Sequence, residues 1–546
     1  MKASDLFLQC LSMQGIKMMY GVPGEENADL MISLLAAPIN FITCTHEQTA
    51  AFMAAMHGYL TGVPGICLGT LGPGATNLMT GVAQAQLDGC PLIAIVGQAE
   101  TKRLHKISHQ NINAIEMFQP ITKWATTILS PDVIPEVIAK AFKVAISGRP
   151  GAVLIELPED IAALDTVVLP IPKIEYSNQE EEADVQINSL INLLQNSSKP
   201  ILLLGDGASR TESDTVVRKF LQHTQLYSAY TFMGKGVVSN LYERSLHCVG
   251  LGLKDIALEA FEQADLVICV GYSMVEWSPI NWNIGVQKHI VHIDAAHAEI
   301  DAHYLPVIEM VGSIPRIIQQ INTKLTAQCI KHEPYFAKIQ HKAETDIRSY
   351  ADDSLFPMKP KRILKDIRDT LADSDILVSD VGAHKMWVAR QYGARQSKTC
   401  IISNGFCAMG GSMPGAMEAK RLYPQKNVVA LCGDGGFMMS IQALFTGVAN
   451  KIPFVVVVWD DHQYGLIKWK QEMHFNEHSH TELVHSDLAA VAKAIGCYAE
   501  RIESSKDFKR ILQQALQQQD KPSVIVVPVD YRENMELFYH LRRTVQ

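Results

Sequence analysis

The sequence predicts an α/β protein built from three open domains, each with a mostly parallel β-sheet. Short runs rich in valine, isoleucine and leucine recur along the chain and are separated by segments of helical length, which is the pattern of strands joined by helical crossovers. Glycine-rich turns directly follow several of these runs, as expected where a strand passes into a helix. At 546 residues the chain is too long for one hydrophobic core, and about three domains are expected.

The clearest apolar runs place strands in all three predicted domains. They are Phe41–Cys44, Gly65–Leu68, Leu92–Val96 and Val153–Leu157 in the first, Ile201–Leu204, Leu266–Val270 and Ile290–Ile293 in the second, and Ile376–Val378, Asn427–Cys432, Pro453–Trp459 and Val524–Val527 in the third. Changes in composition predict an N-terminal domain at 1–165, a linker at 166–187, a central domain at 188–325, a connector at 326–357, a third domain at 358–531 and a tail at 532–546. The first and third domains share this layout, which would fit an old duplication.

The composition is that of an ordinary globular protein, with 47% hydrophobic residues and a net charge of −9. No basic stripe appears, so we expect no nucleic-acid partner. The longest apolar runs stop short of the roughly 20 residues that cross a bilayer, and Met1–Gln14 predicts an amphipathic helix without a cleavage site, so we expect no membrane association and a cytoplasmic location. Eleven cysteines without paired spacing indicate buried small side chains in a reducing compartment.

Two predicted strands of the third domain end in acidic residues. Asn427–Cys432 leads into Gly433-Asp434-Gly435, and Pro453–Trp459 leads into Asp460-Asp461, with a segment of helical length, Phe437–Asn450, between them. In a parallel sheet, ligands bind beyond the carboxyl ends of the strands. The acids therefore lie where a ligand is expected.

The chemistry of this strand edge favours a metal-bound diphosphate. Gly433, Gly435 and Gly436 let the backbone approach a ligand closely, and a helix start attracts phosphate. Asp434 would repel a phosphate unless a divalent cation lay between them, and magnesium prefers such oxygen ligands. The alternative is that this motif is only a turn. Gly205-Asp206-Gly207 in the central domain has no acid 27 residues later, since position 233 is methionine, and we interpret it as a structural turn.

The Gly-Asp-Gly motif and the acidic end of the next strand resemble the cofactor motif of thiamine diphosphate enzymes. The resemblance implies that Asp434, Asp461 and the backbone carbonyl of Gln463 bind Mg²⁺. The usual asparagine of this family is Asp461 here, as in the catabolic acetolactate synthases. Tyr464–Gln471 would help to cover the pocket. The residues implied to bind the cofactor here are Gly433, Asp434, Gly435, Gly436, Asp461, Gln463, Tyr464, Gly465 and Leu466.

Glu47 begins a predicted helix that continues through Met56. A glutamate there could be merely a favourable charge at a helix start. However, Thr45–Ala51 is similar to the RHEQAAA run of acetohydroxyacid synthases. This resemblance implies that Glu47 faces the aminopyrimidine ring of the cofactor, has a raised pKa and shuttles a proton as a catalytic residue.

Asn404–Lys420 contains glycines that predict a loop against a ligand. Met409 would ordinarily be core filler. In the family, the methionine 25 residues before the Gly-Asp-Gly aspartate wedges between the two cofactor rings, which implies this role for Met409. The backbone carbonyl of Cys407 would then accept a hydrogen bond from the pyrimidine amino group.

Three further stretches resemble acetolactate synthases. Leu68–Asn77 is similar to their GPGATN loop, and Ser108–Asn111 to the HQ pair of the catabolic branch. Gln110 could hydrogen-bond an intermediate and His109 could line the pocket, although such residues are mostly solvated surface. Val270–Asn283 is similar to the GYSPVEYEPAMWN stretch of the catabolic enzymes, and the RFDDR run of flavin-containing synthases is missing, so FAD is not expected.

The resemblance implies an acetolactate synthase that uses thiamine diphosphate and Mg²⁺, with pyruvate as the small 2-oxo acid substrate. It also implies a homo-oligomer in which Glu47 of one subunit meets Asp434, Asp461 and Met409 of its neighbour. Two departures bear on the acceptor: Lys470 stands where biosynthetic synthases carry a tryptophan, and Gly21–Asn27 lacks the lysine of the catabolic enzymes. Another carboligase, a lyase or a decarboxylase of this fold remains open, as does an inactive regulatory subunit.

Overall fold

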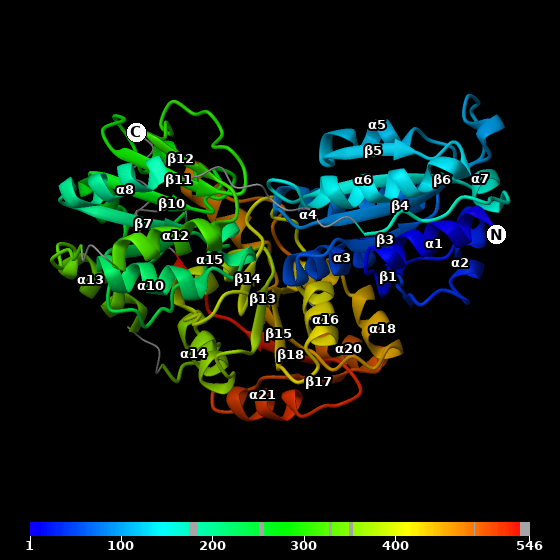
Figure 1. Ribbon diagram of the computed structural model, residues 1–546. Helices are drawn as coiled ribbons and strands as arrows, with labels where there is room; N and C mark the ends of the chain where they lie inside the picture. Colours follow the sequence, from blue (N-terminus) through cyan, green and yellow to red (C-terminus); the bar gives the residue numbers. More distant parts are fainter. Residues whose placement is uncertain (174–183, 251–255, 327–329, 349–352, 485, 535–546) are drawn as a thin grey trace.

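The computed structural model describes residues 1–173, 184–250, 256–326, 330–348, 353–484 and 486–534 (Figure 1). Three six-stranded sheets follow one another along the chain, and every strand pair in them is parallel. Helices cover the sheets, and the three domains appear in Figure 1 as separate blue, green and yellow-to-red units. The predicted fold class is confirmed.

The N-terminal sheet has the strand order β2-β1-β3-β4-β6-β5. Its strands are β1 (Met18–Gly21), β2 (Asn40–Thr43), β3 (Gly65–Gly69), β4 (Leu92–Gln98), β5 (Trp124–Thr127) and β6 (Ala152–Pro158). Its helices are α1 (Ala3–Met13), α2 (Ala28–Ser33), α3 (Glu47–Thr61), α4 (Pro73–Leu87), α5 (Ala114–Phe118), α6 (Ile134–Ile146) and α7 (Glu159–Ala163). The amphipathic helix predicted at the N-terminus is thus α1.

The central sheet has the order β12-β11-β10-β7-β8-β9, that of a doubly wound nucleotide-binding fold. Its strands are β7 (Pro200–Leu204), β8 (Tyr227–Tyr230), β9 (Ser245–Cys248), β10 (Leu266–Val270), β11 (His289–Asp294) and β12 (Ile308–Val311). Its helices are α8 (Asp184–Asn196), α9 (Asp206–Arg210), α10 (Asp214–Thr224), α11 (Leu258–Gln263) and α12 (Ile314–Thr326), and α13 (Ala337–Arg348) follows in the predicted connector.

The C-terminal sheet, with the order β14-β13-β15-β16-β18-β17, repeats the topology of the N-terminal sheet. Its strands are β13 (Ile376–Ser379), β14 (Cys400–Ile402), β15 (Val428–Gly433), β16 (Val455–Asp460), β17 (Tyr498–Arg501) and β18 (Ser523–Pro528). Its helices are α14 (Pro360–Thr370), α15 (Ala383–Gln391), α16 (Ser412–Leu422), α17 (Asp434–Met439), α18 (Gln442–Ala449), α19 (Gly465–Phe475), α20 (Leu488–Ile495) and α21 (Phe508–Leu516). The shared layout predicted for the first and third domains is confirmed.

The N-terminal and C-terminal domains pack together through α3 and α16, which lie side by side (Figure 1). Their apolar side chains join one hydrophobic core. At its edge, the fully buried carboxylate of Glu418 accepts from Tyr20 (2.7 Å) and Arg421 (2.6 Å), and it lies 2.9 Å from His57 Nδ1. These contacts fix the two domains against each other within one chain.

Two local predictions in the third domain were wrong. The predicted helix Phe437–Asn450 is two helices, because the Ser440 N–H bonds back to the Phe437 carbonyl (3.3 Å) and the backbone at Ser440 leaves the helical region. The predicted loop Asn404–Lys420 is a loop only in its first half, since α16 begins at Ser412. The acidic run in the predicted linker and most of the predicted tail lie outside the described residues.

Ten of the eleven cysteines lie in the described residues, and all ten are free thiols. Nine are buried, and only Cys407 among them is partly exposed. This confirms the interpretation of the cysteines as buried small side chains. No helix of the described chain is both long and apolar enough to cross a membrane.

Candidate active site

A cavity of about 260 Å³ lies at the carboxyl edge of the C-terminal sheet. Its walls come from the turns that follow β13, β15 and β16, and from the loop before α16. The strand order reverses between β13 and β15, and the crevice at such a reversal is where open α/β sheets bind ligands.

The cavity brings together eleven residues that the sequence predicted to bind a cofactor. They are Cys407, Met409, Gly433, Asp434, Gly435, Gly436, Asp461, Gln463, Tyr464, Gly465 and Leu466. They come from three separate segments of the chain, which the parallel strands carry to one edge. Their roles toward a cofactor stay predictions.

The floor of the cavity concentrates negative charge. Asp434 is buried, with its Oδ2 accepting from the His462 N–H (2.6 Å) and its Oδ1 from the Gly435 N–H (2.7 Å). Burial, together with the charges of Asp434 and Asp460, raises the pKa of Asp461 to about 8. Burial also raises the pKa of Asp434. These carboxylates are poorly compensated, which is the environment that a cation would stabilise.

Asp460 is the acid at this edge that already has a partner. Its Oδ2 accepts from Arg501 (2.7 Å) on β17, and its Oδ1 lies 3.3 Å from His462 Nδ1. Ligand atoms of Asp434, Asp460 and His462 lie within 4.8 Å of one another. Because Arg501 neutralises Asp460, Asp434 and Asp461 are the carboxylates left for a divalent ion, and oxygen donors of this kind fit Mg²⁺.

Two glycines in the motif have no room for a side chain. A Cβ on Gly436 would lie 2.1 Å from Asp380 Oδ2, and a Cβ on Gly435 would lie 2.9 Å from the Tyr464 ring. The backbone therefore lies directly against these groups. This leaves the space in front of the glycines open for a ligand.

The loop before α16 reaches the cavity in a fixed conformation. Cys407 has a left-handed backbone (φ 60°), and its sulfur lies 3.2 Å from Lys385 Nζ. The Gly410 N–H donates to both carboxylate oxygens of Asp380 (2.9 Å each). Contacts on both sides of Met409 thus hold its side chain at the cavity wall.

Sequence reasoning missed His384 and Tyr531, which also line the cavity. Burial lowers the pKa of His384 to about 3, so the ring is neutral, and its Nε2 has no hydrogen-bond partner among the described residues. The signal for His384 was present, because Ser379-Asp380-Val381-Gly382 follows a strand just as Gly433-Asp434-Gly435 does. Tyr531 follows β18 as the last residue of the predicted third domain, and no motif marks it.

The predicted residues of the N-terminal domain do not line this cavity within one chain. Glu47 is the first residue of α3, is 7% exposed, and accepts from Asn77 Nδ2 (3.0 Å). His109 and Gln110 are exposed on the loop after β4, where Gln110 has a left-handed backbone (φ 55°). Their predicted roles require that another N-terminal domain meet the cavity.

The second Gly-Asp-Gly sequence lies at the carboxyl end of β7. Asp206 is 1% exposed, and both its carboxylate oxygens accept from Arg210 Nε (3.1 Å each). The Glu276 carboxylate accepts from the backbone N–H groups of Asp206 (3.1 Å) and Met233 (2.9 Å). A side chain of the protein thus takes these two backbone amides. The expected absence of FAD stays a prediction.

Comparison with known proteins relates all three domains to one family. Thiamine pyrophosphate is another name for thiamine diphosphate. Residues 1–117 match the N-terminal binding domain of thiamine pyrophosphate enzymes, residues 187–321 match their central domain, and residues 380–527 match their C-terminal binding domain. The acetolactate synthase of Bacillus subtilis (strain 168) is 32% identical over 98% of this chain and 94% of its own length.

Two other relatives agree with these matches. The catabolic acetolactate synthase of Raoultella terrigena is 32% identical over 97% of this chain and 95% of its own length. The large subunit of acetolactate synthase isozyme 2 of Escherichia coli (strain K12) is 28% identical over 98% of this chain and 97% of its own length.

Proposed function

The chain belongs to the family of thiamine diphosphate-dependent acetolactate synthases, and on that premise we propose that it condenses two molecules of pyruvate to 2-acetolactate and CO2. It is an enzyme of the carboligase type. The observation that carries the proposal is the single cavity that gathers eleven predicted cofactor residues at the strand reversal of the C-terminal sheet.

Asp434 and Asp461 would hold a divalent cation and, through it, the diphosphate of the cofactor. Their raised pKa values mark carboxylates that lack a compensating charge, and Mg²⁺ commonly binds one or two carboxylates together with phosphate oxygens. Thiamine diphosphate, when bound, supplies the carbanion stabilisation that lets a 2-oxo acid lose CO2.

Glu47 would exchange the proton that activates the cofactor. Asn77 donates to Oε2 of Glu47, so Oε1 is the atom that would carry this proton. The side chain is buried. Met409, with its bulky apolar side chain, would support the cofactor between its two rings.

A dimer would be the smallest active unit. The residues that line the cavity all come from the C-terminal domain and Tyr531, while Glu47 lies at the carboxyl edge of the N-terminal sheet. A second chain would therefore bring its own Glu47 to the cavity of the first. His109 and Gln110, exposed in the single chain, would lie at the same junction.

Product analysis tests the proposed reaction. The protein is incubated with pyruvate, thiamine diphosphate and Mg²⁺, and pyruvate, CO2, acetolactate and acetaldehyde are measured together. Carboligation releases one CO2 for every two pyruvates consumed, whereas simple decarboxylation releases one for each. Acetaldehyde at the second ratio would make the protein a decarboxylase, and no turnover of pyruvate would direct the search to other 2-oxo acids.

Proton exchange on the cofactor tests the inactive alternative. Bound thiamine diphosphate should exchange the proton of its thiazolium carbon much faster than free cofactor, measured by NMR. Glu47→Gln should slow this exchange by about 100-fold or more and leave the affinity for Mg²⁺ unchanged. No acceleration in the wild type would identify a cofactor-binding protein without catalytic activity.

A further inference from the structure

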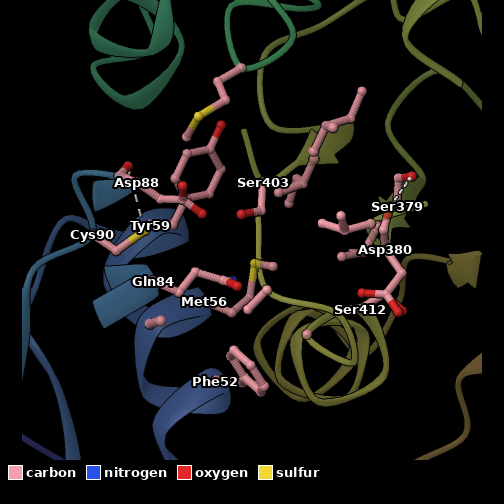
Figure 2. A pocket seen from close by; sticks show the side chains of 18 residues that line it. Phe52, Met56, Tyr59, Gln84, Asp88, Cys90, Ser379, Asp380, Ser403 and Ser412 are labelled. Carbon is pink, nitrogen blue, oxygen red and sulfur yellow. Dashed lines mark hydrogen bonds between the residues drawn. The ribbon is translucent and has the colours of Figure 1, made fainter. Parts of the chain in front are cut away.

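A second, much smaller cavity of about 40 Å³ lies between the N-terminal and C-terminal domains of the same chain. Figure 2 shows Tyr59, Gln84 and Asp88 of the N-terminal domain facing Ser403 of the C-terminal domain across it. This volume has room for only a few water molecules. The region is therefore a packed junction rather than a substrate site. Its function must lie in how it positions the N-terminal and C-terminal domains against each other.

Asp88 makes the most direct contact across this junction. It follows the last residue of α4 and is 4% exposed. Its Oδ1 accepts from the backbone N–H groups of Gly405 (2.8 Å) and Phe406 (3.3 Å). A Cβ on Gly405 would lie 2.6 Å from this oxygen and 2.4 Å from the Leu87 carbonyl, so the two backbones touch.

The segment that Asp88 holds leads into the wall of the cofactor cavity. Cys407 directly follows Phe406 and has a left-handed backbone (φ 60°). Met409 follows two residues later, and both line the cavity of about 260 Å³. A shift at Gly405 or Phe406 would therefore move the atoms that face the ligand.

The turn that carries Asp88 is itself braced by the central domain. Arg149 Nη2 donates to the Leu87 carbonyl (2.6 Å), and its Nη1 donates to Ser273 Oγ (3.0 Å). Gly89 has a left-handed backbone (φ 68°), and a Cβ there would lie 3.2 Å from Asp206 Oδ2 and 3.3 Å from Arg210 Nε. The second Gly-Asp-Gly sequence thus supports this turn.

We propose that Asp88 is a positioning residue, which sets Cys407 and Met409 for the ring half of thiamine diphosphate from the N-terminal domain of the same chain. The inference rests on the proposed function, in which those two residues meet the cofactor rings. Each N-terminal domain then has two tasks: its Asp88 shapes the cavity of its own chain, and its Glu47 serves the cavity of the partner.

Calorimetric titration of the full chain separates the two halves of the ligand. Thiamine diphosphate and inorganic pyrophosphate are each titrated in the presence of Mg²⁺, because pyrophosphate has no rings to contact Cys407 or Met409. Asp88→Ala leaves the N–H groups of Gly405 and Phe406 without this acceptor, and the Kd for thiamine diphosphate should rise about tenfold. The Kd for pyrophosphate should stay within about twofold.

Two further variants control this experiment. Asp88→Asn retains an acceptor oxygen and should keep the wild-type Kd for thiamine diphosphate within about threefold. Asp375→Ala removes another buried aspartate that accepts backbone N–H groups, those of Ala372 (2.8 Å) and Asn427 (2.9 Å), at the opposite end of the sheet. It should lower stability and leave both Kd values unchanged.

The outcomes are distinct. Unchanged affinity for thiamine diphosphate in Asp88→Ala, an equal loss for both ligands, or failure of Asp88→Asn to restore binding would each overturn the positioning role. If the wild type bound pyrophosphate but not thiamine diphosphate, the proposed function itself would fail, and this inference with it. A selective loss in Asp88→Ala that Asp88→Asn restores would support it.

Discussion

The two Gly-Asp-Gly sequences of this chain have the same three residues and opposite environments. Both follow a buried parallel strand where the strand order of its sheet reverses, and in both the aspartate begins a short helix. Asp206 is paired with Arg210, four residues along the same helix. Asp434 instead lies beside two more aspartates and opens into a cavity.

The difference lies in where the compensating charge comes from. In the central domain, Arg210 neutralises Asp206, and the carboxylate of Glu276 takes the backbone amides of the crevice. In the C-terminal domain, burial and the neighbouring acids raise the pKa values of Asp434 and Asp461, and the charges of His462 and Lys468 offset this only in part. A crevice whose charges are paired within the protein, as at Asp206, favours a structural role. A crevice with uncompensated charges, as at Asp434, favours a ligand-binding role.

The largest effect on ligand binding should come from removing Asp434, the aspartate of the motif that faces the cavity. Asp434→Ala should weaken the binding of Mg²⁺ and thiamine diphosphate by more than about 100-fold, since even residues one shell away from a metal cost 10–100-fold. Calorimetry on purified protein measures it. The thermal stability should change little, because the removed charge is poorly compensated while the N–H groups of Gly435 and His462 lose their acceptor. Binding within about threefold of the wild type would show that the two motifs do not differ in function.

The opposite result, a loss of stability without a loss of Mg²⁺ binding, is expected for Asp206 in the central domain. Asp206→Ala leaves Arg210 buried and without its main partner, and it should lower the free energy of unfolding by about 3–5 kcal/mol. Urea denaturation followed by circular dichroism measures this loss. The affinity of the folded fraction for Mg²⁺ should stay that of the wild type. If Asp206→Ala were as stable as the wild type but no longer bound Mg²⁺, the metal site would lie at Asp206, and the structural interpretation of this motif would be wrong.

An arginine can be introduced beside Asp434 in the position that Arg210 has beside Asp206. Met438 lies four residues after Asp434, the position that Arg210 has relative to Asp206. Met438→Arg should supply an internal cation to Asp434 and weaken Mg²⁺ binding by about tenfold, the value of one charge-assisted hydrogen bond. Met438→Leu is the control, and equal effects of the two substitutions would assign the loss to packing rather than charge.

A further prediction concerns the pH dependence of stability in the central domain. Burial and the charge of Asp206 raise the pKa of Glu276 from 4.5 to about 7. Between these values the folded protein keeps a proton that the unfolded chain has lost, so stability falls as pH rises through this window. Relative to Glu276→Gln, the wild type should lose up to about 1.4 kcal/mol per pH unit there. Parallel pH profiles of the two proteins would contradict this.

Burial explains only some of the strands that sequence analysis found or missed, since β8 (Tyr227–Tyr230) is fully buried and was missed as well. β16 (Val455–Asp460) is fully buried and was visible as a run of valines, while β5 (Trp124–Thr127) and β17 (Tyr498–Arg501) lie at sheet edges and are partly exposed. Edge strands need no continuous apolar run, so the sequence does not distinguish them from loops. The fold class could be predicted because the central strands of all three sheets are buried on both faces.

The residues of the candidate site can also be separated into those that the sequence predicted and those that it did not. Asp434, Asp461 and Met409 were predictable because each lies in a turn or loop with a recognisable pattern. Arg210 was also readable as a partner of Asp206, since the two lie one helical turn apart. Tyr531 was missed because its place at the cavity depends on how the strands are ordered in the sheet, whereas His384 was missed although the turn that precedes it signalled the site. In the proposed dimer, the junction of Glu47 with the cavity would involve a second chain, which one sequence does not place.

The central claim is that the acids beyond β15 and β16 hold a divalent cation that binds the diphosphate of the cofactor. Crystals grown with thiamine diphosphate and Mn²⁺ in place of Mg²⁺ test it most directly, because the anomalous signal of manganese locates the ion. We expect one peak per chain between the carboxylates of Asp434 and Asp461, and none at Asp206. A peak elsewhere, or an ion from which either Asp434 or Asp461 points away, would contradict the account.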